Sequence, residues 1–293
     1  MSFEEATKKM EEHYGLDIPA CTIRKITERQ GEAIAEWEPE ETEKEAKLLI
    51  AEMDGSMVPI LELGEKKEGI DLRKTRKVCW KEAKLCFARP QNRVDRVYGA
   101  VIGPPEKAGA KLYECAKKAG LRETTYVHGL GDGAQWIVDQ FETQFGAQSH
   151  FVIDFFHTCE YLAEASYWCD ALDSKRWLKE KKKMMKAGEC KRVLCELKTR
   201  LAQLDEVPGE SGIVKCVRYI EKRVKHMNYG EVKEKQLPIG SGEIESSHRH
   251  VIQKRLKISG AWWKTENANT MLQLRVARAN GYWEGYWDEK KAA

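Results

Sequence analysis

Five acidic residues stand where their chemistry could be used together. Asp54 and Asp132 each follow an apolar run and precede a glycine, and Asp154 closes a third apolar run. Carboxylates at the ends of strands in an α/β sheet often build sites, although a single one commonly caps a turn. Glu243 and Glu245 follow later, at the predicted start of a helix. Carboxylates that converge repel one another, and divalent cations such as Mg²⁺, which prefer hard oxygen ligands, relieve that repulsion.

The distribution of charge suggests what such a site would act on. Residues 170–200 and 246–280 each carry a net charge of +6, whereas residues 1–50 carry −6. Basic segments in a near-neutral chain favour a polyanionic partner, although solvated helix faces give the same pattern. Two metal ions about 3.5–4 Å apart stabilise the attacking and leaving oxygens of a phosphoryl displacement. Acidic residues beside basic segments therefore indicate phosphodiester chemistry.

The composition of the chain and the absence of several sequence motifs restrict the class of protein further. The chain has 293 residues, enough for about two domains, and 50 basic against 47 acidic residues. We expect a soluble, cytoplasmic protein, because no apolar run approaches the length of a membrane span and the first residues contain no apolar signal segment. Nine cysteines without paired CxxC modules favour reduced thiols. Phosphate loops, dinucleotide fingerprints, HExxH and GxSxG are absent from the sequence.

The elements that must position the acidic residues alternate between strands and helices. Apolar runs and period-two patterns predict strands over 48–55, 57–63, 78–87, 124–130 and 150–154. Helical patterns cover 108–119 and 135–145, which gives the order β-β-β-α-β-α-β. Everything from 158 to about 229 reads as helix. A loop over 238–242, a helix over 243–256 and an aromatic helical tail follow.

The first 36 residues have the outline of a helix-turn-helix. A capping box of Ser2 and Glu5 predicts a helix over 2–14, which ends at Gly15, and a second helix begins near residue 21. The outward cations of that second helix are Arg24, Lys25 and Arg29. A plain helical hairpin would show the same pattern. Residues 37–47 read as a charged linker.

Several short pieces, in this order, carry a resemblance to a known family. They are MDGSMVP (53–59), WKEAK (80–84), GDGAQWI (131–137), IDFFH (153–157), PIGSGEIES (238–246), QKRLKISG (253–260) and the Trp-rich end. The chain resembles ISKra-type bacterial insertion-sequence transposases, relatives of the Mutator superfamily, from about residue 2 to residue 287. The resemblance implies a DDE enzyme with an α/β, ribonuclease-H-like fold: a mixed five-stranded sheet with flanking helices, an all-helical insertion and a short N-terminal helix-turn-helix-like segment.

The resemblance also implies the site residues. Asp54, Asp132 and Glu245 would be the catalytic triad and would bind two Mg²⁺ or Mn²⁺ ions. Asp154 is the alternative to Asp132, and it forms with His157 the [C/D]-x-x-H element of that superfamily. Glu243 competes with Glu245, and two residues apart on a helix they cannot share a face. His157 could instead be a buried imidazole with a structural partner.

Other residues are predicted to contact DNA, which would be the terminal inverted repeats and the target. They are Arg24, Lys25, Arg29, Lys181, Lys182, Lys183, His248, Arg255 and Lys257. Arg255 and Lys257 suit a phosphate backbone. Trp262 and Trp263 are either core aromatics or a platform for an unstacked base. A homo-oligomer on DNA is expected, with no membrane partner.

The predicted organisation has four parts. Residues 1–36 form the helix-turn-helix-like segment, which matches only the last part of the family's N-terminal DNA-binding region. Residues 46–157 form the first part of the catalytic domain, 158–236 the helical insertion, and 237–293 the glutamate helix and C-terminal helices. The predicted function is metal-dependent cleavage and transfer of DNA strands at insertion-sequence ends. A nuclease on the same fold, or an inactive or host-adopted DNA-binding remnant, are the alternatives.

Overall fold

Five strands form a mixed sheet in the order β3-β2-β1-β4-β5. The computed structural model describes residues 1–37, 44–64 and 71–292, and residues 38–43 of the predicted charged linker lie outside this range. Internal contacts divide the chain into two units: Met1–Thr125 with Glu243–Ala293, called unit 1, and Tyr126–Gly242, called unit 2. The chain is therefore a mixed α/β protein whose two last strands group with the helical stretch that follows them.

Unit 1 contains an antiparallel meander of β1 (Leu48–Glu62), β2 (Lys77–Pro90) and β3 (Val97–Ile102). The prediction of two strands over 48–55 and 57–63 was wrong, because Asp54 and Gly55 continue the ladder opposite Leu85 and Lys84. Gly55 leaves room for the Glu82 side chain, which would collide with a Cβ atom there. The predicted number of strands was nevertheless right, because β3 is a strand that we did not expect.

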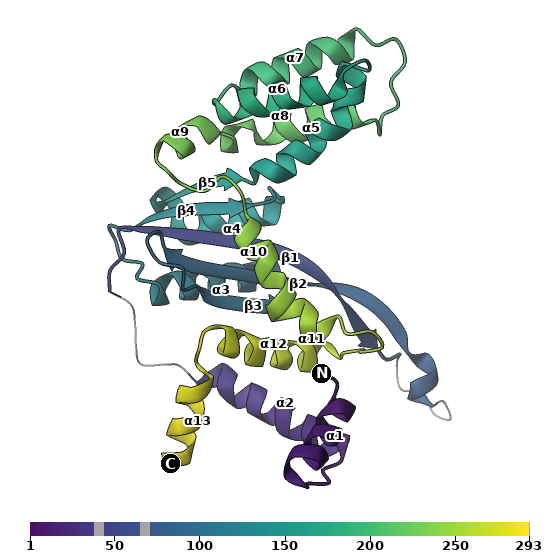
Figure 1. Ribbon diagram of the computed structural model, residues 1–293, viewed down its shortest axis with the longest axis vertical. Helices are drawn as coiled ribbons and strands as arrows, with labels where there is room; N and C mark the ends of the chain where they lie inside the picture. Colours follow the sequence, from purple (N-terminus) through teal and green to yellow (C-terminus); the bar gives the residue numbers. More distant parts are fainter. Residues whose placement is uncertain (38–43, 65–70, 293) are drawn as a thin grey trace. The chain divides into compact units, whose positions relative to one another are not determined.

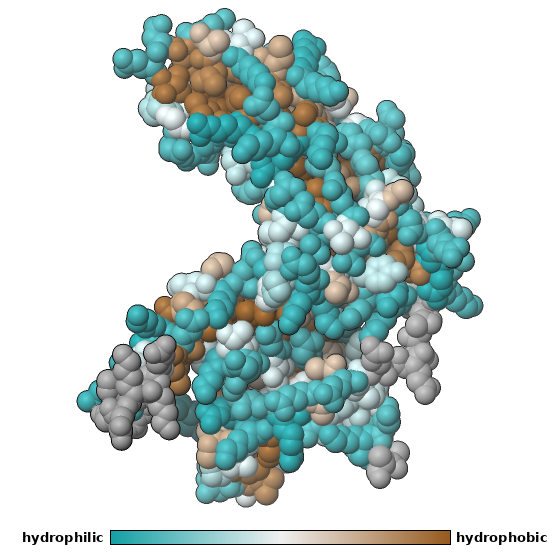
Figure 2. All heavy atoms as spheres, turned by 180° about the vertical axis from the view of Figure 1, so that it is seen from behind, coloured by the Kyte–Doolittle hydropathy of each residue, from teal (hydrophilic) through white to brown (hydrophobic). Residues whose placement is uncertain are grey.

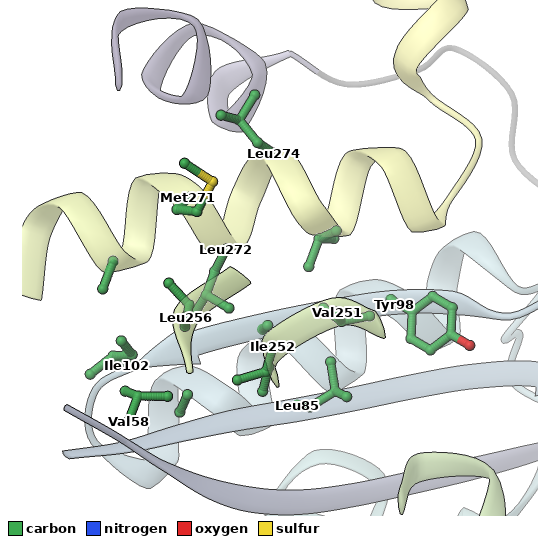
Figure 3. Packing of buried hydrophobic residues seen from close by; sticks show 14 of the residues in the cluster. Val58, Leu85, Tyr98, Ile102, Val251, Ile252, Leu256, Met271, Leu272 and Leu274 are labelled. Atoms are coloured by element: carbon green, nitrogen blue, oxygen red, sulfur yellow. The ribbon is translucent and has the colours of Figure 1, made fainter. Parts of the chain in front are cut away.

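The two faces of this meander are covered by different helices. Side chains alternate along each strand, so Val58, Leu85 and Tyr98 point to one face, where they join a buried apolar cluster with the C-terminal helices. These helices are α10 (Gly242–His248), the π-helix η4 (Arg249–Gln253), α11 (Lys254–Leu256), α12 (Thr265–Ala279) and α13 (Trp283–Ala292). Figure 3 shows the strand side chains meeting those of η4, α11 and α12. Helix α3 (Pro105–Lys118) packs against β2 and β3.

Two helices precede the sheet in unit 1. Helix α1 (Phe3–Tyr14) begins with the predicted capping box and ends at Gly15, whose φ of +65° is the left-handed conformation that glycine tolerates. Helix α2 (Ala20–Glu36) packs on α12, where Gly31 lies against Thr270 with no room for a side chain. One face of α2 is thus used for packing inside unit 1 (Figure 1).

Unit 2 begins with a parallel βαβ element and continues as helices. Strand β4 (Tyr126–Gly131) pairs with β5 (Ser149–Ile153), and α4 (Gln135–Phe145) connects them. The helices that follow are α5 (Phe155–Cys169), α6 (Ser174–Lys186), α7 (Cys190–Ala202), α8 (Gly212–Arg223) and α9 (Tyr229–Glu234). Short 3-10 turns are η1 (Leu72–Thr75), η2 (Gly146–Gln148) and η3 (Val224–His226). Helices α5 to α8 lie together as a bundle (Figure 1).

Within the part of the chain that the structure describes, no helix is both long enough and apolar enough to cross a membrane.

Candidate functional site

Asp54 lies in the middle of β1, not at the end of a strand as the sequence suggested. Because side chains alternate along a strand, its carboxylate shares a face with Val58 and Ile60, the face covered by the C-terminal helices. The Asp54 side chain is 28% exposed, and its Oδ2 atom lies 3.0 Å from Nε2 of His248. A partly exposed carboxylate thus lies between a central strand and a helix.

The helix in question is α10, which carries both candidate glutamates. His248 is buried, whereas Glu245, three residues earlier, is exposed. Residues three apart lie on the same side of a helix, so Glu245 is one turn from the imidazole that meets Asp54. The π-helix η4 follows directly after His248, and such turns are frequent at functional sites. Asp54 and the Glu245 turn therefore lie on one face of the unit 1 strands.

Glu243 has a different role from Glu245. Its carboxylate accepts hydrogen bonds from Arg89 Nε at 3.0 Å, from Arg89 Nη2 at 2.5 Å and from Arg96 Nε at 2.7 Å. Burial raises the pKa of Glu243, but the hydrogen bonds and charges of the two arginines outweigh it and hold the pKa below its ordinary value. Charge-assisted pairs of this kind are among the strong ones in proteins. Glu243 therefore anchors α10 to β2 and to the segment before β3.

Sequence reasoning missed Glu52. It is fully buried, two residues before Asp54 and on the same face of β1, and its Oε2 atom accepts a hydrogen bond from the backbone N–H of Ile244 at 2.9 Å. A buried carboxylate is costly unless it has partners, so this residue fixes the first turn of α10 over β1. The signal that could have found it is a lone acid inside the otherwise apolar run 48–53.

Asp132, in unit 2, caps the loop after β4. Its Oδ1 atom accepts a hydrogen bond from the backbone N–H of Ala134 at 2.8 Å, an Asx turn that leads into α4. Its carbonyl oxygen accepts a hydrogen bond from the Tyr219 hydroxyl at 2.8 Å. Gly133 has a left-handed φ of +82°, and its carbonyl oxygen accepts from Arg223 Nε at 2.8 Å. Helix α8 thus fixes the Asp132–Gly133 turn, a role of Tyr219 and Arg223 that the sequence did not reveal.

Asp154, the alternative second ligand, is buried and fully engaged within unit 2. Its Oδ1 atom accepts from the backbone N–H of His157 at 2.8 Å, which caps α5. Its Oδ2 atom accepts from the backbone N–H and the hydroxyl of Ser241, at 2.5 and 2.6 Å. The backbone N–H of Phe155 donates to Ile239 at 2.8 Å. Asp154 therefore fastens the segment 238–241, which leads towards α10, to the start of α5.

His157 is partly exposed in the same helix. Its Nδ1 atom lies 3.2 Å from Glu160 Oε2, and its ring packs edge-on against Tyr161 and Tyr219. These two tyrosine rings stack with centroids 3.9 Å apart. Its ring thus packs on an aromatic group in unit 2, with 34% of the side chain exposed.

The predicted DNA contacts fall into two groups. Exposed side chains, which a phosphate could reach, are Arg24, Lys25, Arg29, Lys183 and Lys257, and Lys182 is half-buried. His248 and Lys181 are buried. Lys181 bonds to Glu180 at 2.8 Å and to Glu196 at 2.5 Å, so its ammonium group is already paired in the interior of the bundle.

Arg255, Trp262 and Trp263 differ in how far they are exposed to solvent. The Arg255 guanidinium lies 4.6 Å from the Phe3 ring centroid and 4.8 Å from that of Trp263, and burial lowers its pKa. Trp263 is buried in the core, as one of the two sequence alternatives held, whereas Trp262 is 56% exposed. Arg255 therefore joins α1 to the C-terminal segment inside unit 1.

Among residues 1–37, 44–64 and 71–292, no group of three or more His, Cys, Asp and Glu side chains could hold a metal ion. Asp54 and Glu245 belong to unit 1, and Asp132 and Asp154 to unit 2.

Comparison with known proteins gives the class of this chain. Residues 113–291 match the Uncharacterised protein family (UPF0236), and since the match covers more than half of the chain, the protein belongs to that family. The matched range contains Asp132, Asp154 and Glu245, and Asp54 precedes it. A search of curated proteins finds no match. The family description states no activity.

Proposed function

We propose that this protein is a DDE-type transposase that cleaves DNA strands at insertion-sequence ends and joins them to target DNA. The observation that carries the proposal is the placement of Asp54 on a central strand, 3.0 Å from His248 and facing the helix that presents Glu245. The proposal includes the ribonuclease-H-like fold, to which an acid on the first strand and an acid on a later helix belong in the family that the sequence resembles.

The anchoring of α10 supports this reading. Glu52 holds the first turn of the helix, and Glu243 holds it through Arg89 and Arg96. Catalysis by charge stabilisation needs groups that are fixed before the reaction. A buried carboxylate and a double arginine pair are costly features for a helix that serves packing alone. They fit a helix whose exposed glutamate must keep its position.

Of the two candidate acids in unit 2, the hydrogen bonds favour Asp132. Both carboxylate oxygens of Asp154 accept hydrogen bonds within the unit. Asp132 is partly exposed after the end of β4, and its carboxylate accepts one hydrogen bond, from the backbone N–H of Ala134. We therefore propose Asp132 as the third catalytic carboxylate and Asp154 as the residue that positions the segment 238–241.

Carboxylate oxygens are the donors that Mg²⁺ and Mn²⁺ prefer, so Asp54, Asp132 and Glu245 fit such ions in chemical type. Bound ions would stabilise charge on the attacking and leaving oxygens. The described residues do not gather three such donors at one point. His248 lies 3.0 Å from the Asp54 carboxylate, and Glu52 and Glu243 hold α10. In the proposed mechanism these contacts place the carboxylates of Asp54 and Glu245 beside the scissile phosphate.

The test is a cleavage and strand-transfer assay with the DNA that flanks the gene, in Mg²⁺ and in Mn²⁺. We expect Asp54→Asn, Asp132→Asn and Glu245→Gln each to lower cleavage by roughly 100-fold or more while DNA binding persists. Glu106→Gln, an exposed carboxylate at the start of α3, is the matched control and should keep full activity.

Three results would contradict the proposal. Full activity in the Asp54 and Glu245 variants would remove the carboxylate mechanism. Cleavage by the wild-type protein without strand joining would show the nuclease alternative. DNA binding with no cleavage in either metal would show the inactive DNA-binding alternative.

A further inference from the structure

The far end of the β1–β2 hairpin exposes a group of large apolar side chains. Strand β3 pairs with residues 83–88 of β2, so residues 77–82 and their partners in β1 extend past it. The exposed fractions are 46% for Met57, 42% for Leu63, 46% for Val78 and 60% for Trp80. Alternation and register place Met57, Val78 and Trp80 on the same face of the hairpin, and Leu63 follows the last residue of β1. Brown atoms beside a grey segment at the lower left of Figure 2 mark this region.

A second exposed indole lies next to the same stretch of β1. The backbone N–H of Leu61 donates to the carbonyl oxygen of Trp263 at 2.7 Å, and Trp263 forms a β-bridge with Ile60. Trp262, the residue before, is 56% exposed. On the other side of β1, Trp80 is the register partner of Pro59. We call residues 57–63, 77–82 and 261–264 the hairpin arm; it carries one exposed indole on each side of β1.

Exposed cations lie in the hairpin arm or close to it in sequence. They are Lys74, Arg76, Lys77, Lys254, Lys257 and Lys264. Both carboxylates in the arm are paired: Glu62 with Lys81 at 2.9 Å, and Glu82 with Lys84 at 2.7 Å. The arm therefore combines two aromatic surfaces with a positive rim.

We infer that the hairpin arm binds unpaired nucleotides of DNA, with Trp80 and Trp262 stacking on bases and the exposed cations contacting phosphates. Surfaces for single-stranded nucleic acid combine these two features, because every base offers a face for stacking and the backbone is uniformly charged. A protein interface also combines an apolar centre with a polar rim. The excess of exposed cations over exposed carboxylates in and near the arm favours a polyanion instead. The inference extends the proposed function, because transposition exposes strand ends.

The test is fluorescence anisotropy of the full-length protein with a labelled single-stranded oligonucleotide, in EDTA so that no strand is cut. We expect Trp80→Ala and Trp262→Ala each to weaken binding roughly 5- to 150-fold, the range for one lost base stack. Duplex of the same sequence should change less. The control is Tyr167→Ala, an aromatic residue of unit 2 that is 68% exposed; it should bind as the wild type does.

The cationic rim is tested by salt dependence. Arg76→Gln with Lys77→Gln should lower the slope of log Kd against log salt by about 1.4, since each phosphate contact on a single strand contributes about 0.7. The matched control is Lys107→Gln with Lys117→Gln, two exposed lysines of α3, which should leave the slope unchanged.

Several outcomes separate this inference from the proposed function. Asp54→Asn should bind single strands normally, so a loss of cleavage with binding intact leaves the inference standing. Unchanged affinity in both tryptophan variants, with melting temperatures equal to that of the wild type, would overturn it. If Trp80→Ala instead abolished self-association in sedimentation while binding of DNA persisted, the hairpin arm would be a protein interface and the inference would be wrong.

Discussion

The sharpest test of the site concerns two glutamates that are two residues apart. Glu243→Gln should destabilise the protein more than Glu245→Gln does. Glu243 receives charge-assisted hydrogen bonds from Arg89 and Arg96, and the side chains of the three residues are 27%, 13% and 30% exposed. Glutamine keeps an acceptor oxygen but loses the negative charge between two guanidinium groups. Glu245 is exposed.

The size of the effect follows from these contacts. Hydrogen bonds to charged groups contribute about 1.5–3 kcal/mol each, and breaking one partner of a buried ion pair costs about 3–5 kcal/mol. Partial exposure lowers the cost, and Arg89 Nη1 keeps its bonds to the backbone carbonyls of Pro90, Gln91 and Arg93. We therefore expect a loss of about 2–3 kcal/mol. For a unit of this size, that loss lowers the melting temperature by roughly 5–10 °C.

The dependence on pH gives an independent check. The pKa of Glu243 is below its ordinary value in the folded protein, so its stabilisation is complete above the unfolded pKa of about 4.3–4.5 and is lost as pH falls through the folded value. The difference in stability between wild type and Glu243→Gln should therefore be constant near neutral pH and shrink below about pH 4.5.

The assay is thermal unfolding followed by circular dichroism, with a double-mutant cycle of Glu243→Gln and Arg96→Met. The two changes should be non-additive, because each removes the same pair. DNA cleavage measured well below the melting temperature should fall less in Glu243→Gln than in Glu245→Gln. Additive losses in the cycle, or equal melting temperatures for the two glutamate variants, would refute this account of how α10 is held.

Three further predictions concern unit 2. Lys181→Met should lower the free energy of urea unfolding by about 1–2 kcal/mol, because the side chain is 7% exposed and paired with two glutamates. The control Lys183→Ala, at an exposed lysine, should change it by less than about 0.5 kcal/mol. Equal effects of the two substitutions would contradict the pairing. Asp154→Ala should lower the free energy of unfolding by about 2–4 kcal/mol and raise hydrogen exchange at Ser241, whose N–H and hydroxyl lose their acceptor. Unchanged exchange at Ser241 would show that Asp154 does not hold the segment 238–241. Burial lowers the pKa of His128 to about 4. Because the unfolded chain then takes up a proton more readily than the folded one, the free energy of unfolding should fall by up to about 3 kcal/mol as pH drops from 6.5 to 4. Melting curves of His128→Gln should show a flatter dependence on pH.

Much of the fold follows from local sequence signals. The capping box of Ser2 and Glu5 fixes the start of α1, and the apolar period fixes α4 over Gln135–Phe145. The sequence did not show that β1 continues through Asp54-Gly55. A short acidic-glycine pair has the local signature of a turn, and only the ladder with β2 and the Glu82 side chain over Gly55 make it part of a strand.

The candidate site, too, could be predicted from the sequence only in part. The acidic residues and their order along the chain could be read from the sequence, because carboxylates beside glycines after apolar runs are a local pattern. The partners that assign each acid its role could not. Arg89 is separated from Glu243 by 154 residues, Glu52 from Ile244 by 192, and Ser241 from Asp154 by 87.

The sequence by itself therefore determined the alternation of strands and helices, the uneven charge and the short list of acidic candidates, because all of these depend on residues close together in the chain. Tertiary structure decided which acids are anchors and which face solvent. Glu243 and Asp154 owe their anchoring roles to what the fold brings to them: two arginines and a serine from distant segments. A pairing of this kind depends on how strands and helices pack, which no local pattern specifies.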